Sequence, residues 1–236
     1  MIFFILLIFA TNILAQEDFC VKAALETQDL LKNYKFSEME KKLEEVISTC
    51  PIEKYINLHH QLAMVYIWKE KFDKAKPIVE KITKEIEYKQ AQVPSSLQLG
   101  KGRILNVMYA NYTNDNKSID KELSDFDNLN FKSQEAVLFY LLRKNDKRFM
   151  QYYGIRRQVK GDLAPLLCQV YCKKNNIIKD CPCTEKVDKK FEGGIYLILQ
   201  EYLDGTDLKV LKEKIEKNYK DAPGIKKEIF EILNIN

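Results

Sequence analysis

The feature that most constrains the fold is the spacing of apolar residues, which is helical along nearly the whole chain beyond residue 15. No segment alternates apolar and polar residues with a period of two, so a β-sheet is not expected. Turn-forming residues interrupt the helical pattern at Asn33-Tyr34, Pro51, Lys71, Pro94, Asn111–Asn116, Asn145-Asp146 and Gly161. The sequence therefore predicts an all-α protein made of antiparallel helical hairpins.

The first two hairpins can be aligned with each other at an offset of 36 residues. A small residue in the pattern, such as Ala63 or Ala75, lets two helices approach closely, and large neighbours then lock between them. The offset pairs five positions: Leu30 with Tyr66, Phe36 with Phe72, Met39 with Ala75, Leu43 with Val79, and Val46 with Ile82. A pattern that recurs at this period indicates a helical-hairpin repeat.

The second hairpin resembles a tetratricopeptide repeat. The packing positions of that family are occupied in order by Leu62-Ala63, Tyr66, Phe72, Ala75, Val79 and Ile82. The first hairpin keeps Phe36 and has Pro51 where the second helix of the family commonly ends, but it has Glu26-Thr27 where Leu-Gly or Leu-Ala is usual. The resemblance covers about residues 20–90 and implies a short right-handed α-solenoid of stacked hairpins with a peptide-binding concave face. A compact helical bundle is the alternative architecture.

Further hairpins are expected beyond the resemblance. Helices at residues 96–110 and 118–129 would form a third hairpin, and helices at 133–144 and 147–160 a fourth. Three ranges define the organisation of the chain: 1–15 as a cleaved signal peptide, 16–160 as the hairpin-repeat region, and 161–236 as a cysteine-containing helical region. Helices in the last region are expected at 162–174, 186–202, 206–219 and 223–233.

The first fifteen residues, Met1–Ala15, form an apolar run without a charged side chain. The run is shorter than the roughly 20 residues of a membrane span, and Ala15 provides the small residue that precedes signal-peptide cleavage. A retained membrane anchor is the alternative. Cleavage predicts a protein that is secreted or resides in the lumen of the secretory pathway, without stable membrane insertion.

Six cysteines are expected to form three disulfides in that compartment. Cys20 and Cys50 lie at similar distances on either side of the turn at residues 34–36, so the antiparallel arms should bring them together. A disulfide between them would stabilise the fold by roughly 3–4 kcal/mol, because it lowers the entropy of the unfolded chain.

The other four cysteines lie close together in the sequence. Cys168 and Cys172 share one helical face, and Cys181 and Cys183 return beside it after a turn. The simplest pairing is nested, Cys172 with Cys181 and Cys168 with Cys183, while the crossed pairing stays open. A zinc site with four thiolates is the alternative; an oxidising compartment and the unusual spacing favour disulfides, and we expect no metal.

Two sequons, at Asn111 and Asn116, fit the N-glycosylation pattern. Both fall in the same predicted turn between helices, which should be exposed. We therefore expect glycosylation at one or both positions in a host that glycosylates.

No arrangement of residues indicates catalysis. The two histidines, His59 and His60, are adjacent and point about 100° apart on a helix, so they cannot share a metal ion. The sequence has no glycine-rich phosphate loop, and its net charge of +4 is too small to require nucleic acid as a partner. We expect no cofactor and no enzymatic activity.

One basic segment could bind an anion. Tyr152 and Tyr153 lie among its charges, and the candidate residues are Arg143, Arg148, Arg156, Arg157 and Lys160. Such a face could hold an acidic glycan, a phosphate-bearing head group or an acidic peptide. The alternative is a solvated surface balanced by carboxylates elsewhere in the fold.

Three functions are consistent with these features. The leading hypothesis is a secreted interaction module that binds a protein or peptide on the repeat surface. The second is a secreted carrier of a small apolar ligand or lipid, and the third is an effector that acts on a host protein. A continuous concave groove would favour the first, whereas a buried apolar cavity would favour the second.

Overall fold

The computed structural model describes residues 19–92, 96–156, 158, 163–177, 179–183 and 194–235, with only the helical backbone described for 86–92 and 96–102. The predicted signal peptide, Met1–Ala15, lies outside the described residues, as do Arg157, Lys160 and the predicted boundary at residues 160–161.

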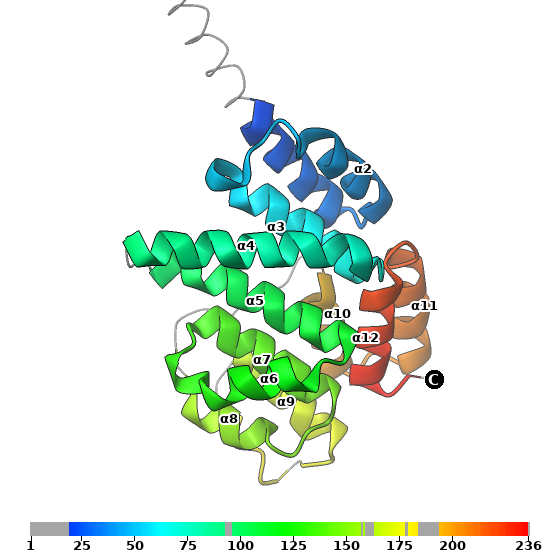
Figure 1. Ribbon diagram of the computed structural model, residues 1–236. Helices are drawn as coiled ribbons and strands as arrows, with labels where there is room; N and C mark the ends of the chain where they lie inside the picture. The colour runs from blue at the N-terminus through cyan, green and yellow to red at the C-terminus, as the bar shows by residue number, and fades with distance from the viewer. Residues whose placement is uncertain are drawn as a thin grey trace, which may run out of the picture.

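The regular elements of the described residues are all helices, and these residues contain no strand, which confirms the all-α prediction. A first helix at residues 19–32 is followed by eleven labelled α-helices (Figure 1): α2 Phe36–Val46, α3 Ile52–Trp68, α4 Phe72–Gln92, α5 Ser96–Thr113, α6 Asn116–Ser124, α7 Phe131–Arg143, α8 Phe149–Ile155, α9 Ala164–Lys174, α10 Gly194–Leu203, α11 Leu208–Asn218 and α12 Pro223–Leu233. A short 3-10 turn, η1 at Phe126–Asn128, lies between α6 and α7.

A recurring turn ends many of these helices. One residue adopts a positive φ, and the next N–H donates to a carbonyl in the last helical turn, which satisfies backbone groups that the helix end leaves unpaired. In the first two hairpins the bonds run from Lys35 to Leu30 and from Lys71 to Tyr66, at 2.9 and 2.8 Å. The residues with positive φ at helix ends are Tyr34, Glu70, Asn114, Asn145, Asn176, Gly205 and Asn234.

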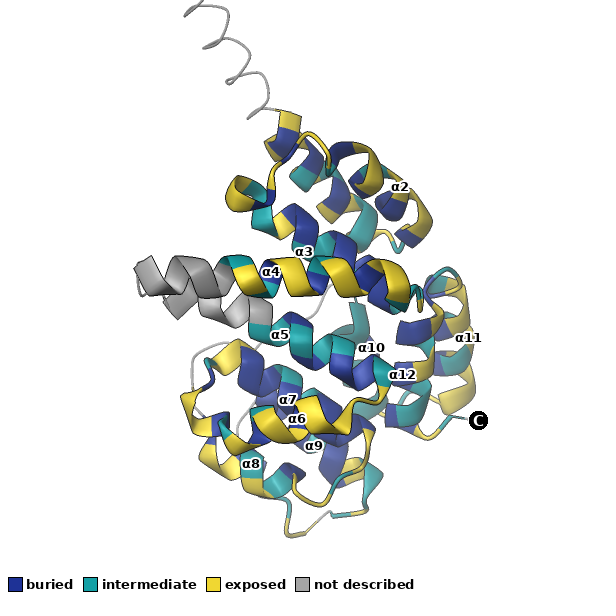
Figure 2. Ribbon diagram, viewed as in Figure 1, coloured by how far each residue is buried: buried dark blue, intermediate teal, exposed yellow. Residues whose placement is uncertain are grey.

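The helices pack as a stack of hairpins (Figure 1). The first helices of successive hairpins contact one another in chain order, α3 with α5, α5 with α7, and α7 with α9. The second helices, α4, α6 and α8, each pack against the first helices on either side of them in the sequence. Buried residues line the helix faces that meet, while the outer faces of α6 and α11 are exposed (Figure 2).

The C-terminal helices fold back onto this stack. Helix α10 packs against α9, and α12 packs against both α3 and α7. Two clusters of buried side chains result, one from the first helix to α5 and one from α5 to α12, with Phe36 of α2 included in the second cluster. The first helices of the hairpins form one side of the stack. The C-terminal end of the chain therefore covers this side.

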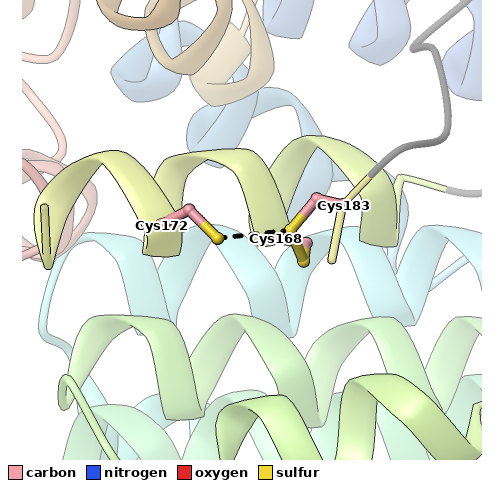
Figure 3. A group of neighbouring side chains, drawn as sticks. All are labelled: Cys168, Cys172 and Cys183. Atoms are coloured by element: carbon pink, nitrogen blue, oxygen red, sulfur yellow. Dashed lines mark hydrogen bonds between the residues drawn. A yellow bond between two sulfur atoms is a disulfide. The ribbon is translucent and has the colours of Figure 1, made fainter. Parts of the chain in front are cut away.

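Three disulfides join the described cysteines, and none of these cysteines is free. Cys20, at the start of the first helix, bonds to Cys50. This disulfide closes the open end of the first hairpin, as predicted. Cys168 and Cys172 of α9 bond to Cys183 and Cys181, the nested arrangement. Figure 3 shows the sulfurs of Cys168, Cys172 and Cys183 close together beside α9. The Sγ atoms of Cys172 and Cys183 are 3.5 Å apart. In this oxidised state the sulfurs are not thiolate ligands for zinc.

No described helix is long and apolar enough to cross a membrane.

Candidate ligand-binding cavity

A cavity of about 730 Å³ lies between the hairpin stack and the C-terminal helices. Its walls come from α3, α5 and α7 on one side and from α10 and α12 on the other, with the turn around Tyr34 at one edge. Most of the lining is apolar or aromatic, including Met64, Val107, Met108, Ala136, Phe139, Ile195 and Ile225. A cavity of this size and chemistry is typical of sites for small apolar molecules.

Four aromatic residues join the first hairpin to the C-terminal helices at one wall. Phe36 meets the edge of Trp68 and stacks on Tyr219, with both pairs of ring centroids 5.9 Å apart. Tyr34 contacts Tyr219 edge-on at 5.3 Å, and its hydroxyl accepts a hydrogen bond from the Gly194 N–H at 3.0 Å. Aromatic pairs in these geometries stabilise a contact beyond the area they bury, so this cluster holds the cavity closed on one side.

A buried polar group sits in the otherwise apolar wall. Glu228 of α12 is only 5% exposed. Its Oε1 accepts a hydrogen bond from Nδ2 of Asn111 at 2.9 Å, and its Oε2 accepts one from the Tyr112 hydroxyl. Burial raises the pKa of the Glu228 carboxyl to about 6, because removal from water disfavours the charged form.

Arg143 of α7 lies behind this group. Its Nε forms an ion pair with Glu231, and its Nη1 donates to Oδ1 of Asn111 at 3.0 Å. The guanidinium also lies 5.2 Å from the centre of the Tyr112 ring. Asn111 therefore links Arg143 to Glu228, and the network extends from the cavity wall toward the surface at Glu231.

The basic groups of the cavity lie elsewhere. Lys32 and Lys132 line it but are exposed. Nζ of Lys132 forms an ion pair with Oε2 of Glu135 at 2.7 Å, and Oε1 of Glu135 accepts a hydrogen bond from the Leu163 N–H at 2.9 Å. The cavity thus has a cationic, solvent-facing part and a buried part that carries a carboxylate.

The prediction of an anion-binding face is wrong for two of its residues, which are buried. Arg143 and Arg156 are 6% and 7% exposed, because each packs its guanidinium against protein groups. Arg156 donates to the Tyr153 carbonyl at 3.0 Å and lies over the ring of the same residue. Arg148 is exposed but bonds to Asp146 at 2.8 Å and to Asp120 at 3.4 Å. Arg157 and Lys160 are outside the described residues.

The two sequons differ in environment. Asn111 was expected in an exposed turn, and this expectation is wrong: it lies in the last turns of α5, is 4% exposed, and uses the nitrogen that would carry a glycan to bind Glu228. Asn116, at the start of α6, is exposed. Of the two, only Asn116 has an environment that suits an N-glycan.

The sequence contains one signal for this site, which belongs to no motif. In the predicted helix at 223–233, Glu228 occupies the apolar stripe formed by Ile225, Ile229 and Ile232. A carboxylate on the buried stripe of an amphipathic helix needs a partner inside the protein. Its partner, Asn111, is 117 residues away, so no local pattern identifies it.

No family model, curated protein or solved structure matches this chain.

Proposed function

We propose that this protein is a non-enzymatic carrier that holds a small, largely apolar molecule in the cavity between its hairpin stack and its C-terminal helices. The supporting observation is the cavity itself, with its volume of about 730 Å³ and its mainly apolar lining. Burying an apolar ligand there contributes about 25 cal/mol for each Å² removed from water.

The same geometry weighs against the leading hypothesis of a peptide-binding repeat surface. The resemblance to tetratricopeptide repeats implies a peptide held along the first helices of the hairpins. Here α12 packs against two of those helices, α3 and α7. A partner that used this face would have to displace part of the protein's own core, which includes Ile229 and Ile232 at 0% exposure.

The arrangement of the buried carboxylate supports a binding role over a catalytic one. Its hydrogen-bond partners are an amide and a phenol. A hydrolase of the Ser-His or Cys-His type needs a histidine beside a nucleophile. The cysteines are held in disulfides. We place the carrier outside the cell or in the secretory lumen, because disulfides persist in oxidising compartments and the leader has the features of a signal peptide.

Titration with diphenylhexatriene, a neutral hydrocarbon that fluoresces in apolar surroundings, tests the proposal. We expect saturable binding of one probe per protein. Ala136→Phe fills part of the cavity from α7 and should raise the Kd by at least about tenfold. The matched control is Val210→Phe, at an exposed position on α11, which should bind as the unmodified protein does. An unmodified protein that binds no probe, or equal binding by both variants, would overturn the carrier.

A further inference from the structure

The charges around the cavity specify the head group of its ligand. The carboxylate of Glu228 has about four lone-pair sites, of which Asn111 and Tyr112 use one each. In the described part of the chain no cation forms an ion pair with Glu228. Arg143 acts on it at longer range, through Asn111 and through its charge, which lowers the pKa of the Glu228 carboxyl by less than burial raises it. The site can therefore accept a further hydrogen bond.

The balance of charge in the buried part is negative. Arg143 is paired with Glu231, and Lys132 is paired with Glu135. Glu228 is left as a buried anion with neutral hydrogen-bond donors only. A buried charge is costly unless an opposite charge pairs with it, so a cation placed beside Glu228 would relieve this cost.

The walls of the cavity also suit a cation with an apolar body. Aromatic rings attract a cation over their faces in addition to contacting an apolar chain, and six aromatic side chains line the cavity besides Tyr112: Tyr34, Phe36, Trp68, Phe139, Tyr196 and Tyr219. A carboxylate head group would instead have to stay at Lys32 and Lys132, which are exposed and screened by salt.

We propose that the ligand is an apolar amine, with its ammonium group bound by the Glu228 carboxylate and its hydrocarbon part enclosed by the cavity. This inference rests on the proposed carrier function and names the class of ligand. Glu228 thereby determines specificity, while the apolar walls provide most of the contact area.

Displacement of diphenylhexatriene by decylamine, decanol and decanoic acid tests the inference, because the three share a ten-carbon skeleton and carry different head groups. At pH 7.5 decylamine should displace the probe at a concentration about tenfold lower than decanol, since a charge-assisted hydrogen bond replaces a neutral one. Decanoic acid should be the weakest. Equal affinity for amine and alcohol, or tighter binding of the acid, would overturn the amine assignment while leaving the carrier intact; failure of the probe itself to bind would overturn the carrier.

Glu228→Gln should bring the amine and the alcohol to similar affinities. The matched control is Glu216→Gln, at an exposed position on α11, which should retain the preference for the amine. If both variants retain the preference, Glu228 does not bind the head group.

The unmodified protein supplies a second readout that needs no variant. Protonation of Glu228 removes its charge, so the preference for decylamine over decanol should decline as the pH falls from 7.5 to 5. The other titratable or charged groups around Glu228 and the cavity are His60 on α3, Tyr112 on α5, Lys132, Glu135 and Arg143 on α7, Tyr196 on α10, Tyr219 after α11, Glu231 on α12, and Lys32 and Tyr34 at the first turn. A preference that does not change with pH, or one that still changes in Glu228→Gln, would contradict the role of Glu228.

Discussion

Gly224, near the start of α12, sets how closely the C-terminal helix approaches the hairpin stack. A Cβ atom at this position would lie 2.9 Å from the carbonyl oxygen of Trp68 and 3.1 Å from that of Ile67. It would also lie 2.8 Å from a ring carbon of Tyr112, the residue that binds Glu228. Because two of these neighbours are backbone atoms, they cannot rotate away.

Gly224→Ala should therefore lower the free energy of unfolding by about 1–3 kcal/mol, the usual cost of overpacking. The matched control is Gly154→Ala in α8, where an added Cβ meets nothing within 4 Å. Helix propensity predicts a gain of about 0.5–1 kcal/mol for that change. Urea unfolding followed by circular dichroism measures both. A Gly224→Ala protein as stable as the control variant would show that α12 does not pack this closely.

Glu228 predicts how stability changes with pH. Its pKa is raised from 4.5 to about 6, so between these values the folded protein holds a proton that the unfolded chain has lost. The contribution of Glu228 to stability is complete below about pH 4.5 and is lost as the pH rises through 6. The size of the shift corresponds to about 2 kcal/mol.

The comparison with Glu228→Gln isolates this contribution, because the other titrating groups are common to both proteins. The unfolding free energy of the unmodified protein, minus that of the variant, should fall by about 2 kcal/mol from pH 4 to pH 7. Chemical denaturation across this range measures the difference. A difference that is constant or rises with pH would show that Glu228 is not a buried, hydrogen-bonded carboxyl.

At the scale of single residues, the sequence shows where polar and charged residues cluster, but it does not predict which of them are buried. Arg143 lies in a run of basic residues, and its neighbours suggested a solvated surface. Its burial results from Glu231 and Asn111, which belong to helices far away in the sequence. Asn111 is misplaced for the same reason: α5 extends through Thr113, one turn further than residues 96–110, and carries Asn111 into the core.

At the scale of helices and turns, local signals predict where the helices lie and some of their ends. The expected helix at 162–174 is α9, Ala164–Lys174, and the expected helix at 223–233 is α12, Pro223–Leu233. The turns also follow from the sequence, because residues that tolerate a positive φ, such as Asn114 and Asn145, lie where apolar spacing breaks. Other helix ends differ from the prediction: the helix expected at 118–129 ends at Ser124, and the helix expected at 147–160 ends at Ile155.

The disulfide of the first hairpin belongs to this scale. Cys20–Cys50 closes a loop with a sequence separation of 30, whereas Cys172–Cys181 closes one of 9. By loop entropy, Cys20→Ala with Cys50→Ala should cost about 3–4 kcal/mol, and Cys172→Ala with Cys181→Ala about 2–3 kcal/mol. Thermal and urea unfolding of the two double variants measures the order. A larger loss from the shorter loop would contradict the assignment of the first bridge as the stronger clamp.

At the scale of the whole molecule, the sequence does not predict that the C-terminal helices fold back onto the hairpin stack. Repeated hairpins predict a stack with an open face, and helical spacing at 206–219 and 223–233 predicts two more helices without placing them. Their position depends on contacts between distant residues, such as Phe36 with Tyr219 and Asn111 with Glu228. The cavity exists only because these helices return to the stack, so it could not be found from any one segment.

Trp68 offers a direct way to show whether this cavity binds a ligand. It is the only tryptophan in the chain and it lines the cavity. Bromine quenches tryptophan fluorescence at short range, so bromodecanol should quench Trp68 in a saturable manner if its chain enters the cavity. We expect saturation at one ligand per protein, weaker quenching in Ala136→Phe, and unchanged quenching in Val210→Phe. Quenching that rises linearly with concentration, as for free tryptophan in solution, would contradict this expectation.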